Sequence, residues 1–391
     1  MLDGLIQLST WGYIALAAVL TQITIASVTL YLHRNQSHNA MELHPVVSHF
    51  FRLWLWLTTG MVTREWVAIH RKHHAKCETP EDPHSPQVEG IAKVLFGGVW
   101  LYHQEAKNRE TLSRYGQGTP DDWMERNVYS RFPSLGILIT LTVNSLLFGW
   151  IGAVIFLVQV AWIPFWAAGV INGIGHFWGY RNYETPDASR NLFPIGFFIG
   201  GEELHNNHHG HAASARFAHK WYEFDIGWMY IRILQFFGLA RVKKLAPRTT
   251  LQFDKAVADL ETVRAVIRNR FHIMKLYASN VIRPVIREEK RGESTYVRTL
   301  LRRARKLMSR EDLVLDGRAN DTLNEVLKLN NNLKTVYQFK LQLKQLWQQS
   351  AINHTKRLEA LQDWCREAEK SGIKQLQQFS QSLRGYSLKM N

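Results

Sequence analysis

Apolar residues are unevenly distributed along the chain, and their spacing changes character beyond its middle. Residues 11–32 form an uncharged run of 22 positions, which is about the length needed to cross the hydrocarbon core of a bilayer. No basic segment precedes this run, and it is longer than the apolar part of a typical signal peptide. We therefore predict a retained transmembrane helix here.

Two further apolar stretches follow. Residues 134–171 are long enough for two spans joined by a turn near residues 148–150, which predicts a transmembrane hairpin. In residues 44–66, by contrast, Arg52 and Arg64 bracket only about eleven uncharged positions, too few for an ordinary span. The tryptophans of this stretch suit the headgroup region of a membrane; they are Trp54, Trp56 and Trp66. We predict a shallow or re-entrant segment.

From about residue 248 onward the chain becomes polar, and its apolar residues recur at helical spacing. Residues 298–310 form a strongly basic helix candidate. Neither strand-like alternation nor a solenoid repeat is visible. We predict a membrane domain at residues 1–246 and a basic, soluble helical tail at residues 247–391.

Charge and cysteine content add two restrictions. The chain has 48 Lys and Arg against 33 Asp and Glu, yet no Lys or Arg occurs among the first 33 residues. Its two cysteines, Cys77 and Cys365, exclude a disulfide framework and fit a reducing compartment.

Nine of the seventeen histidines fall in four short motifs at the ends of the apolar stretches: HRNQSH, HRKHH, NGIGH and HNNHH. They supply His33, His38, His70, His73, His74, His176, His205, His208 and His209 as candidate metal ligands. A lone histidine at a membrane end is usually an interfacial hydrogen-bonding residue, but four motifs together indicate ligation. We interpret the others as structural or surface residues: His44, His49, His84, His103, His211, His219, His272 and His354.

The spacing within the motifs favours two metal ions. Positions i, i+3 and i+4 of a helix share one face, so each HxxHH triad converges, while its adjacent pair is splayed by about 100°. One histidine of each pair can therefore reach one ion and its neighbour another. His33 and His38 are five positions apart, so we expect local unwinding between them. All-imidazole sites suit iron, zinc, copper or nickel.

A re-entrant segment at residues 44–66 would keep all four motifs on one membrane face. The loop 64–132 and the tail are rich in Lys and Arg, which makes that face cytoplasmic. The predicted fold class is thus an all-α membrane protein, with transmembrane helices, a cytoplasmic histidine-rich di-metal cap and a C-terminal soluble helical region.

Over residues 10–246 the sequence closely resembles the integral-membrane fatty acid desaturases of the Δ9 type, which include stearoyl-CoA desaturases and bacterial acyl-CoA or acyl-phospholipid desaturases. The resemblance lies in HRNQSH, EWVAIHRKHH, NGIGHFWGYRNYETPDASRN and GEELHNNHHGHAASARFAHKWYEFDIGW. It implies a bacterial plasma-membrane enzyme with two iron ions that consumes O2 and inserts a cis double bond into an acyl chain on phospholipid or CoA. The nine histidines would be iron ligands, and Asn172 would reach a metal through water. Glu203 and Leu204 stand where the family commonly has Gly-Trp.

The residues around the motifs suggest supporting roles. Ligating imidazoles usually donate their other N–H to a carboxylate, and the nearby candidates are Glu65, Glu78, Asp82, Glu184, Asp187, Glu202 and Glu203. Trp66 and Trp178 are candidates for lining a narrow apolar acyl tunnel, or else for interfacial packing. We interpret Cys77 as incidental.

No haem motif, iron–sulfur cysteine set, P-loop or dinucleotide fingerprint supplies the two electrons that desaturation needs. We expect a separate donor, a ferredoxin or cytochrome with its NAD(P)H-dependent reductase. Arg241, Lys243 and Lys244 belong to a basic face that would steer an acidic donor.

Other functions remain open for parts of the chain. A membrane alkane or lipid hydroxylase would use similar histidine motifs but insert oxygen, and a metal transporter would need ionisable residues inside the spans. The tail is predicted to pack as an accessory or to lie on anionic lipid, or else to dock a partner. We expect no nucleic acid partner, since no nucleic-acid-binding motif accompanies the charge.

Overall fold

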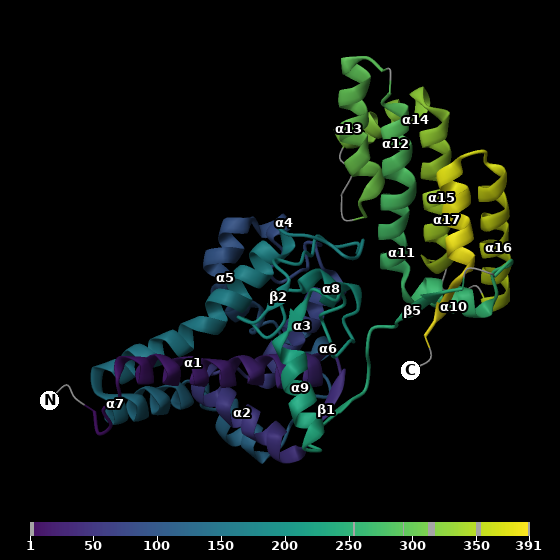
Figure 1. The fold of residues 1–391 in the computed structure, drawn as a ribbon. Coiled ribbons are helices and arrows are strands. Elements are labelled where there is room, and N and C mark those ends of the chain that lie inside the picture. Colours follow the sequence, from purple (N-terminus) through teal and green to yellow (C-terminus); the bar gives the residue numbers. More distant parts are fainter. Residues whose placement is uncertain (1–3, 253–254, 292, 312–316, 349–352, 390–391) are drawn as a thin grey trace. The chain divides into compact units, whose positions relative to one another are not determined.

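The computed structural model describes residues 4–252, 255–291, 293–311, 317–348 and 353–389. It divides into two compact units (Figure 1). The first comprises residues 1–181 and 187–246, and the second comprises residues 182–186 and 247–391. Both units are mostly helical, with three two-stranded β-pairs in the described part of the chain.

The first unit contains α1 (Thr10–Ala26), η1 (Ser27–Ser37), β1 (Met41–Leu43), α2 (Pro45–Thr59), α3 (Thr63–Lys76), α4 (Pro86–Glu89), α5 (Ile91–Glu105), α6 (Arg109–Tyr115), η2 (Glu125–Tyr129), α7 (Pro133–Ile163), η3 (Pro164–Ile171), η4 (Ile174–His176), β2 (Ile195–Gly196), α8 (His205–Gly210), β3 (Phe224–Asp225), α9 (Ile226–Phe236) and β4 (Ala240–Val242). β1 pairs with β4 in antiparallel register, and β2 pairs with β3 in parallel.

Two helices in the described ranges are long and apolar enough to cross a membrane, Thr10–Ser37 and Pro133–His176. The second is interrupted at Gly149, whose φ of 63° and ψ of −142° lie outside the helical region. A positive φ suits glycine, which has no Cβ to clash with the backbone. The chain therefore changes direction inside α7, at the position where the sequence predicts a turn.

The parts of α7 before and after Gly149, here called its two arms, make polar contacts with neighbouring residues of α1 and α2. On the first arm, Thr140 Oγ1 donates to the carbonyl of Leu57 (2.9 Å). On the second arm, Gln159 Nε2 donates to Thr24 Oγ1 (3.3 Å), and Thr24 lies 3.5 Å from Thr58 through their hydroxyl oxygens. The arms thus pack side by side against α1 and α2 (Figure 1). The number of membrane crossings stays a prediction.

The short α2 follows from its end signals. Pro45 occupies the first turn, where its missing N–H costs nothing, and Gly60 ends the helix in the left-handed region with φ 63°. Fifteen residues span about 22 Å at 1.5 Å per residue, less than a hydrocarbon core of about 30 Å. This length is compatible with the shallow or re-entrant segment expected at residues 44–66, which stays a prediction.

The α-helix is locally unwound at His33 and His38, as expected, but the backbone remains helical. Residues 27–37 form a π-helix, with the His38 N–H donating to the His33 carbonyl (3.2 Å). In a π-helix hydrogen bonds run between residues five apart, which aligns positions i and i+5 on one face. The two histidines are therefore brought together by a wider helix, without loss of backbone hydrogen bonding.

Arg34 fixes this π-helix to the rest of the unit. Its buried guanidinium donates to both carboxylate oxygens of Asp225 (2.9 and 3.0 Å), just ahead of α9, and lies 3.9 Å from the Phe217 ring centre. A Cβ on Gly227 would lie 2.0 Å from Arg34 Nη1, so glycine is needed there. This charge-assisted pair, in which Nη2 alone donates to both oxygens, holds the first histidine motif in register with the last part of the unit.

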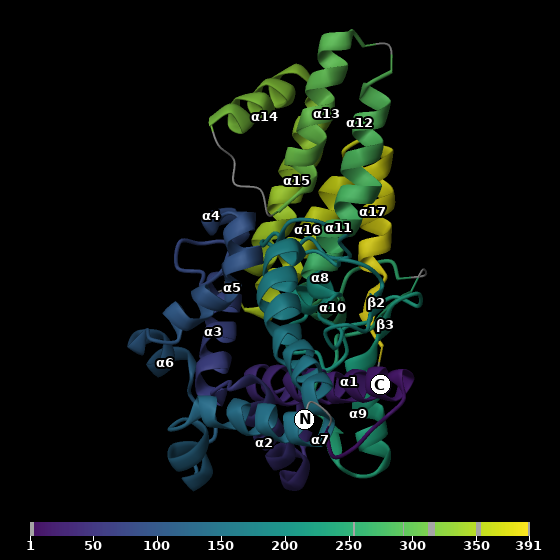
Figure 2. The same cartoon turned by 90° about the vertical axis from the view of Figure 1, so that its left-hand side faces the viewer.

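The second unit contains β5 (Thr249–Leu251), α10 (Leu260–Arg268), α11 (Arg270–Tyr277), η5 (Ala278–Ile282), α12 (Arg283–Glu289), α13 (Thr295–Ser309), α14 (Gly317–Leu329), α15 (Asn331–Gln348), α16 (His354–Lys370), α17 (Lys374–Arg384) and β6 (Tyr386–Leu388). Figure 2 shows the helices of this unit. They enclose an apolar core around Tyr277, Leu343, Trp364 and Phe379. β5 and β6 pair in antiparallel register, a departure from the all-helical expectation because three-residue strands are too short to show alternation.

A buried ion cluster in the second unit gives a stability prediction. Glu311 accepts from Lys340 and Lys344, both at 2.6 Å, and Lys340 is only 4% exposed. In Glu311→Gln the buried ammonium of Lys340 loses its countercharge, so we expect the second unit to lose about 2 kcal/mol or more. Amide exchange of α15 against denaturant concentration, in the solubilised full chain, measures this loss. Asp363→Asn, which removes an exposed partner of Arg366, should change little.

The Glu311 effect should also depend on pH. Burial alone would raise the pKa of Glu311, but the charges of Lys340 and Lys344 lower it overall. A lowered carboxyl pKa adds stability above the unfolded value and loses it as pH falls through the folded value. The difference between the native chain and Glu311→Gln should therefore be complete at pH 7 and shrink below about pH 4. A difference that is constant with pH would contradict the assignment.

Candidate metal centre

The four histidine motifs lie on four short elements that meet in the first unit. The first lies at the C-terminal end of η1, the second lies on the last turns of α3, the third ends η4 and the fourth forms α8. Five of the side chains gather in one group, here called the five-histidine cluster: His33, His38, His70, His74 and His208. Their nearest ring nitrogens all lie within 4.8 Å of one another.

Ring nitrogens in this cluster face one another in pairs. His208 Nε2 lies 3.0 Å from His33 Nε2 and 2.8 Å from His74 Nε2. His70 Nε2 lies 2.8 Å from His38 Nε2 and 3.1 Å from His74 Nε2. Five Nε2 atoms therefore surround a common point.

The other four histidines form the four-histidine cluster: His73, His176, His205 and His209. His176 Nε2 lies 2.9 Å from His205 Nε2. Donor atoms of His73, His176 and His209 lie within 4.8 Å of one another, together with the thiol of Cys77. His209 Nε2 is buried and has no hydrogen-bond partner among the described residues.

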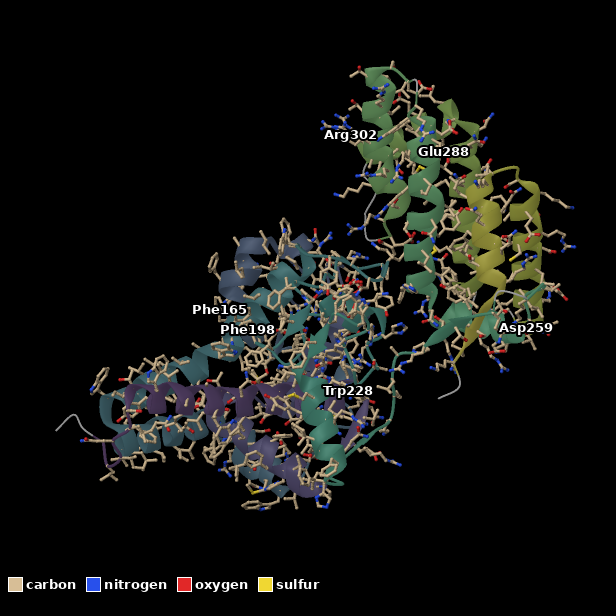
Figure 3. All side chains as sticks on the ribbon, in the orientation of Figure 1. Phe165, Phe198, Trp228, Asp259, Glu288 and Arg302 are labelled. Carbon is tan, nitrogen blue, oxygen red and sulfur yellow. The ribbon has the colours of Figure 1, made fainter. Side chains whose placement is uncertain are left out.

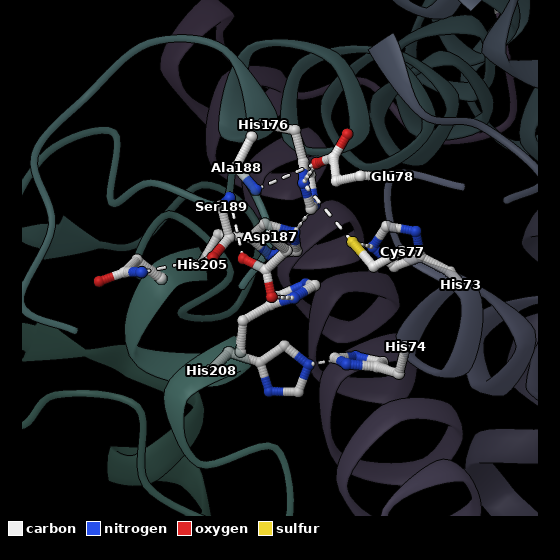
Figure 4. Close-up of polar contacts among 12 residues, drawn as sticks. His73, His74, Cys77, Glu78, His176, Asp187, Ala188, Ser189, His205 and His208 are labelled. Carbon is white, nitrogen blue, oxygen red and sulfur yellow. Dashed lines mark hydrogen bonds and ion pairs between the residues drawn. The ribbon is translucent and has the colours of Figure 1, made fainter. Parts of the chain in front are cut away.

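Adjacent histidines are divided between the clusters, as the 100° offset predicts. His74 and His208 belong to the first cluster, whereas their neighbours His73 and His209 belong to the second. The His74 and His209 ring centres lie only 4.5 Å apart. The two clusters are thus neighbours, linked through α3 and α8 (Figure 4).

The Nδ1 atoms of the four-histidine cluster are oriented by carboxylates. His73 Nδ1 lies 3.0 Å from Asp82, and His209 Nδ1 lies 3.1 Å from Asp187. His176 Nδ1 lies 2.9 Å from Glu78 (Figure 4). Glu202 lies 3.6 Å from His205 Nδ1 and also pairs with His33 Nδ1 in the five-histidine cluster. Such partners fix the imidazole tautomer, which leaves Nε2 free to accept a metal ion.

Burial keeps the imidazoles neutral. It lowers the pKa of His70, His74 and His208 well below the ordinary value, and neighbouring histidines add to this effect. Burial also lowers the pKa of His73, but the charge and hydrogen bond of Asp82, together with the charges of Glu78 and Asp187, raise it overall. Neutral imidazole is the form that binds metals, so the lowered pKa values of His70, His74 and His208 favour metal binding.

A cavity of about 520 Å³ reaches the five-histidine cluster. His70, His84 and Asn172 line it together with apolar residues of α3, α5, α7 and η3, including Ile69, Val99, Ile137 and Ala168. Trp66 also lines it and stacks on the His70 ring, with ring centres 4.9 Å apart. Trp178 is 65% exposed and is not among the lining residues.

Comparison with known proteins decides the family. The sequence model described as fatty acid desaturase matches residues 9–226, more than half of the chain. The chain belongs to the fatty acid desaturase family. The resemblance inferred from its histidine motifs is thereby confirmed, and the protein is an oxidoreductase that desaturates fatty acids.

Similar proteins include three with related names. The desaturase is 29% identical over 247 residues to Delta-9 acyl-lipid desaturase 1 of Arabidopsis thaliana, covering 60% of this chain and 76% of that protein. It is 32% identical over 243 residues to the Delta-9 desaturase-like 3 protein of the same plant (60% and 78% covered). It is 30% identical over 246 residues to the sn-1 stearoyl-lipid 9-desaturase of Anabaena variabilis (61% and 86% covered).

The second unit of the desaturase resembles something different. A family model described as transposase matches residues 239–390. Within the described residues, all groups of three or more His, Cys, Asp and Glu side chains that could hold a metal lie between His33 and His209. The similarity therefore brings no metal-binding carboxylate cluster into the described part of the tail.

The other three candidate carboxylates, Glu65, Glu184 and Glu203, are described by other contacts. Glu65 lines the cavity, and Glu184 lies in the second unit, 3.5 Å from Lys275. Glu203 accepts backbone N–H groups of the loop before it, from Phe198, Ile199 and Gly201 (2.5, 3.1 and 3.2 Å). Burial raises the Glu203 pKa to about 7, although these hydrogen bonds oppose the rise.

Two residues near the clusters were interpreted as peripheral from the sequence. His84 is 7% exposed and its ring stacks on His73, with centres 4.5 Å apart; burial lowers its pKa to about 3. The Cys77 thiol lies 3.8 Å from His73 Nε2. The sequence position of His84, two residues after Asp82, could have indicated its place beside His73, because Asp82 orients the His73 ring.

The charges of Arg241, Lys243 and Lys244, which are expected to steer an electron donor, are partly neutralised. Glu42 on β1 pairs with Arg241 at 2.6 Å and with Lys243 at 3.2 Å, across the β1–β4 pair. Lys244 forms no such pair within the described residues. Donor steering stays a prediction, with less uncompensated charge at this place than the sequence suggested.

Proposed function

We propose that this desaturase holds two iron ions, one in each histidine cluster, and uses O2 to insert a cis double bond, at the Δ9 position, into a saturated acyl chain. The observation that supports this most directly is the convergence of nine imidazoles, six buried and three half-buried, on two neighbouring points. The metal ligands in this proposal are the nine histidines, with Asn172 acting through water.

The donor set fits a metal ion of ordinary size. Two nitrogens at right angles on one ion lie about 3 Å apart when each bond is about 2.1 Å long. The Nε2 pairs of the five-histidine cluster lie 2.8 to 3.1 Å apart. Iron is preferred to zinc because the reaction of this family removes electrons from the substrate, and zinc has no redox chemistry.

When bound, the irons supply the oxygen chemistry that removes hydrogen from an unactivated methylene pair. The protein's own side chains position the reactants. The cavity beside His70 would take the acyl chain, and Trp66, stacked on His70, would hold the reacting carbons near the five-histidine cluster while excluding water. Asp82, Glu78, Asp187 and Glu202 would keep the imidazoles oriented.

The substrate carrier is proposed to be a phospholipid or CoA. The printed names of the relatives include acyl-lipid and stearoyl-lipid desaturases, which favours a lipid-bound chain. The two apolar helices support a membrane location, and the excess of Lys and Arg in the loop 64–132 and the tail supports a cytoplasmic position for the histidines. The membrane is proposed to be a bacterial plasma membrane. Electrons would come from a separate ferredoxin or cytochrome with its NAD(P)H reductase.

Loss of one orienting carboxylate should weaken the centre without unfolding it. Asp82 accepts from His73 Nδ1 and from the backbone N–H groups of Glu78 and His84. We expect Asp82→Asn to lower desaturation or iron retention on the order of 10- to 100-fold, the usual cost of such a partner. Product formation and iron per chain measure this effect. Glu81→Gln, which changes the neighbouring exposed carboxylate, should match the native protein.

The function can be tested in a host that lacks desaturases. Expression should yield Δ9-unsaturated chains in the phospholipid or thioester fraction, identified by gas chromatography, with O2 consumed and about two irons per chain. Hydroxylated chains would instead show a lipid hydroxylase. Zinc as the sole bound metal, without O2 consumption, would overturn the oxidative assignment in favour of metal transport.

A further inference from the structure

The positive charge of the chain is concentrated in the second unit. Residues 247–391 contain 28 Lys and Arg against 15 Asp and Glu, whereas residues 1–246 contain 20 against 18. The tail therefore carries a net charge of +13 out of +15. Neither histidine cluster includes a residue of this unit, since both lie in the first unit.

Within the unit, basic side chains collect on one helical hairpin. On α13, Leu300, Leu301, Ala304 and Met308 face the core. The opposite side of the helix is exposed and basic; it carries Arg298, Arg302, Arg303, Arg305 and Lys306. The neighbouring α12 and the turn after it add Arg283, Arg287, Lys290 and Arg291. These nine residues are called the basic face; Figure 3 labels Arg302, which points away from the helices.

The basic face is not balanced by nearby carboxylates. No ion pair within 4.0 Å joins any of its nine residues to a carboxylate in the ranges that the structure describes. The two acids of α12 have other hydrogen-bond partners: Glu288 accepts from Gln375, and Glu289 accepts from Asn330 and Asn332. Partial burial lowers the pKa of Lys290, and the charges of Arg305 and Arg302 lower it further, so cations of both helices repel one another.

Clustered cations of this kind bind polyanions, and the attachment of this chain to a membrane favours anionic lipid headgroups among them. β4 of the first unit ends at Val242 and α10 of the second begins at Leu260, so a short stretch of chain tethers the basic face to a membrane protein. A short tether gives the nearest anionic surface a high effective concentration. Anionic headgroups attract polybasic helices next to membrane segments. No tether of this kind holds nucleic acid close to the basic face, although residues 239–390 are similar to a transposase family.

We propose that the basic face of α12 and α13 binds the anionic headgroups of the membrane that holds the desaturase. The face carries few apolar side chains of its own, so binding would be electrostatic and sensitive to salt. This interaction is separate from the proposed iron chemistry: it concerns the second unit alone and would hold even if the metal centre had another role.

The test uses the full chain in lipid nanodiscs, with a fluorescent dye on a cysteine introduced as Thr299→Cys, an exposed position on α13. Quenching by nitroxides attached to lipid headgroups reports proximity of α13 to the surface. At 100 mM salt we expect at least threefold more quenching in discs with about 30% phosphatidylglycerol than in phosphatidylcholine discs, and its loss in 0.5 M salt.

Two charge variants make the test specific. Arg298→Gln, Arg302→Gln, Arg303→Gln and Arg305→Gln together should abolish the additional quenching. The matched control removes four exposed charges elsewhere in the unit, by Lys328→Gln, Lys334→Gln, Lys356→Gln and Lys374→Gln, and should retain it. Circular dichroism checks that both variants fold. Equal quenching in neutral and anionic discs would overturn the proposal, and binding of duplex DNA that is lost in the four-arginine variant would then assign the basic face to nucleic acid.

Discussion

Replacing His208 with alanine is expected to abolish desaturation. His208 Nε2 lies between His33 Nε2 and His74 Nε2, so its removal opens the five-histidine cluster on two sides. Loss of an orienting partner alone costs on the order of 10- to 100-fold, and loss of a ligand should exceed 100-fold. Product yield by gas chromatography and iron per chain by mass spectrometry should fall together.

The control for His208→Ala is His354→Ala, which changes an exposed histidine at the start of α16 in the second unit. It should leave both yield and iron content at native values. A His208→Ala protein that keeps more than about a tenth of native activity would remove His208 from the ligand set and with it the proposed geometry of the first metal.

Filling the cavity with Ile137→Trp is expected to change which acyl chains are accepted. Ile137 lines the cavity from α7, whereas His70 lines it from α3. An indole at Ile137 removes space that a long chain needs, and a few methylene groups in an apolar pocket are worth on the order of 10- to 100-fold in rate. Activity on 18-carbon chains should therefore fall much more than activity on 14-carbon chains.

The neighbouring residue supplies the comparison for this experiment. Leu138 follows Ile137 on the same helix but is 58% exposed and does not line the cavity. Leu138→Trp should preserve the native chain-length profile. If both substitutions gave the same profile, the acyl chain would have to bind outside this cavity.

The centre was largely predictable from the sequence because its geometry follows from helix periodicity. The HRKHH and HNNHH motifs place adjacent histidines about 100° apart, and the structure assigns them to different clusters. The turn at Gly149 was equally accessible, since an apolar run of that length must reverse to stay within a membrane. Both predictions depend on local spacing, which a sequence displays directly.

Features that depend on tertiary contacts were harder to predict. The π-helix at residues 27–37 arises where Arg34 and both histidines of the first motif must point inward together, and no residue pattern marks a five-residue hydrogen-bond register. Seven carboxylates lay near the motifs, but only the fold selects the four that meet imidazoles. His84 was missed because burial, and not motif spacing, brings it beside His73.

The grouping of residues 182–186 with the second unit bears on how the role of the tail should be studied. Glu184 is 1% exposed, its N–H donates to the Phe271 carbonyl, and its carboxylate lies 3.5 Å from Lys275 and 3.7 Å from Arg310. A protein shortened at residue 247 would lose these three contacts of Glu184, which lies three positions before Asp187, the partner of His209. Inactivity of such a deletion would therefore be ambiguous, and single exchanges such as Lys275→Met offer the cleaner genetics.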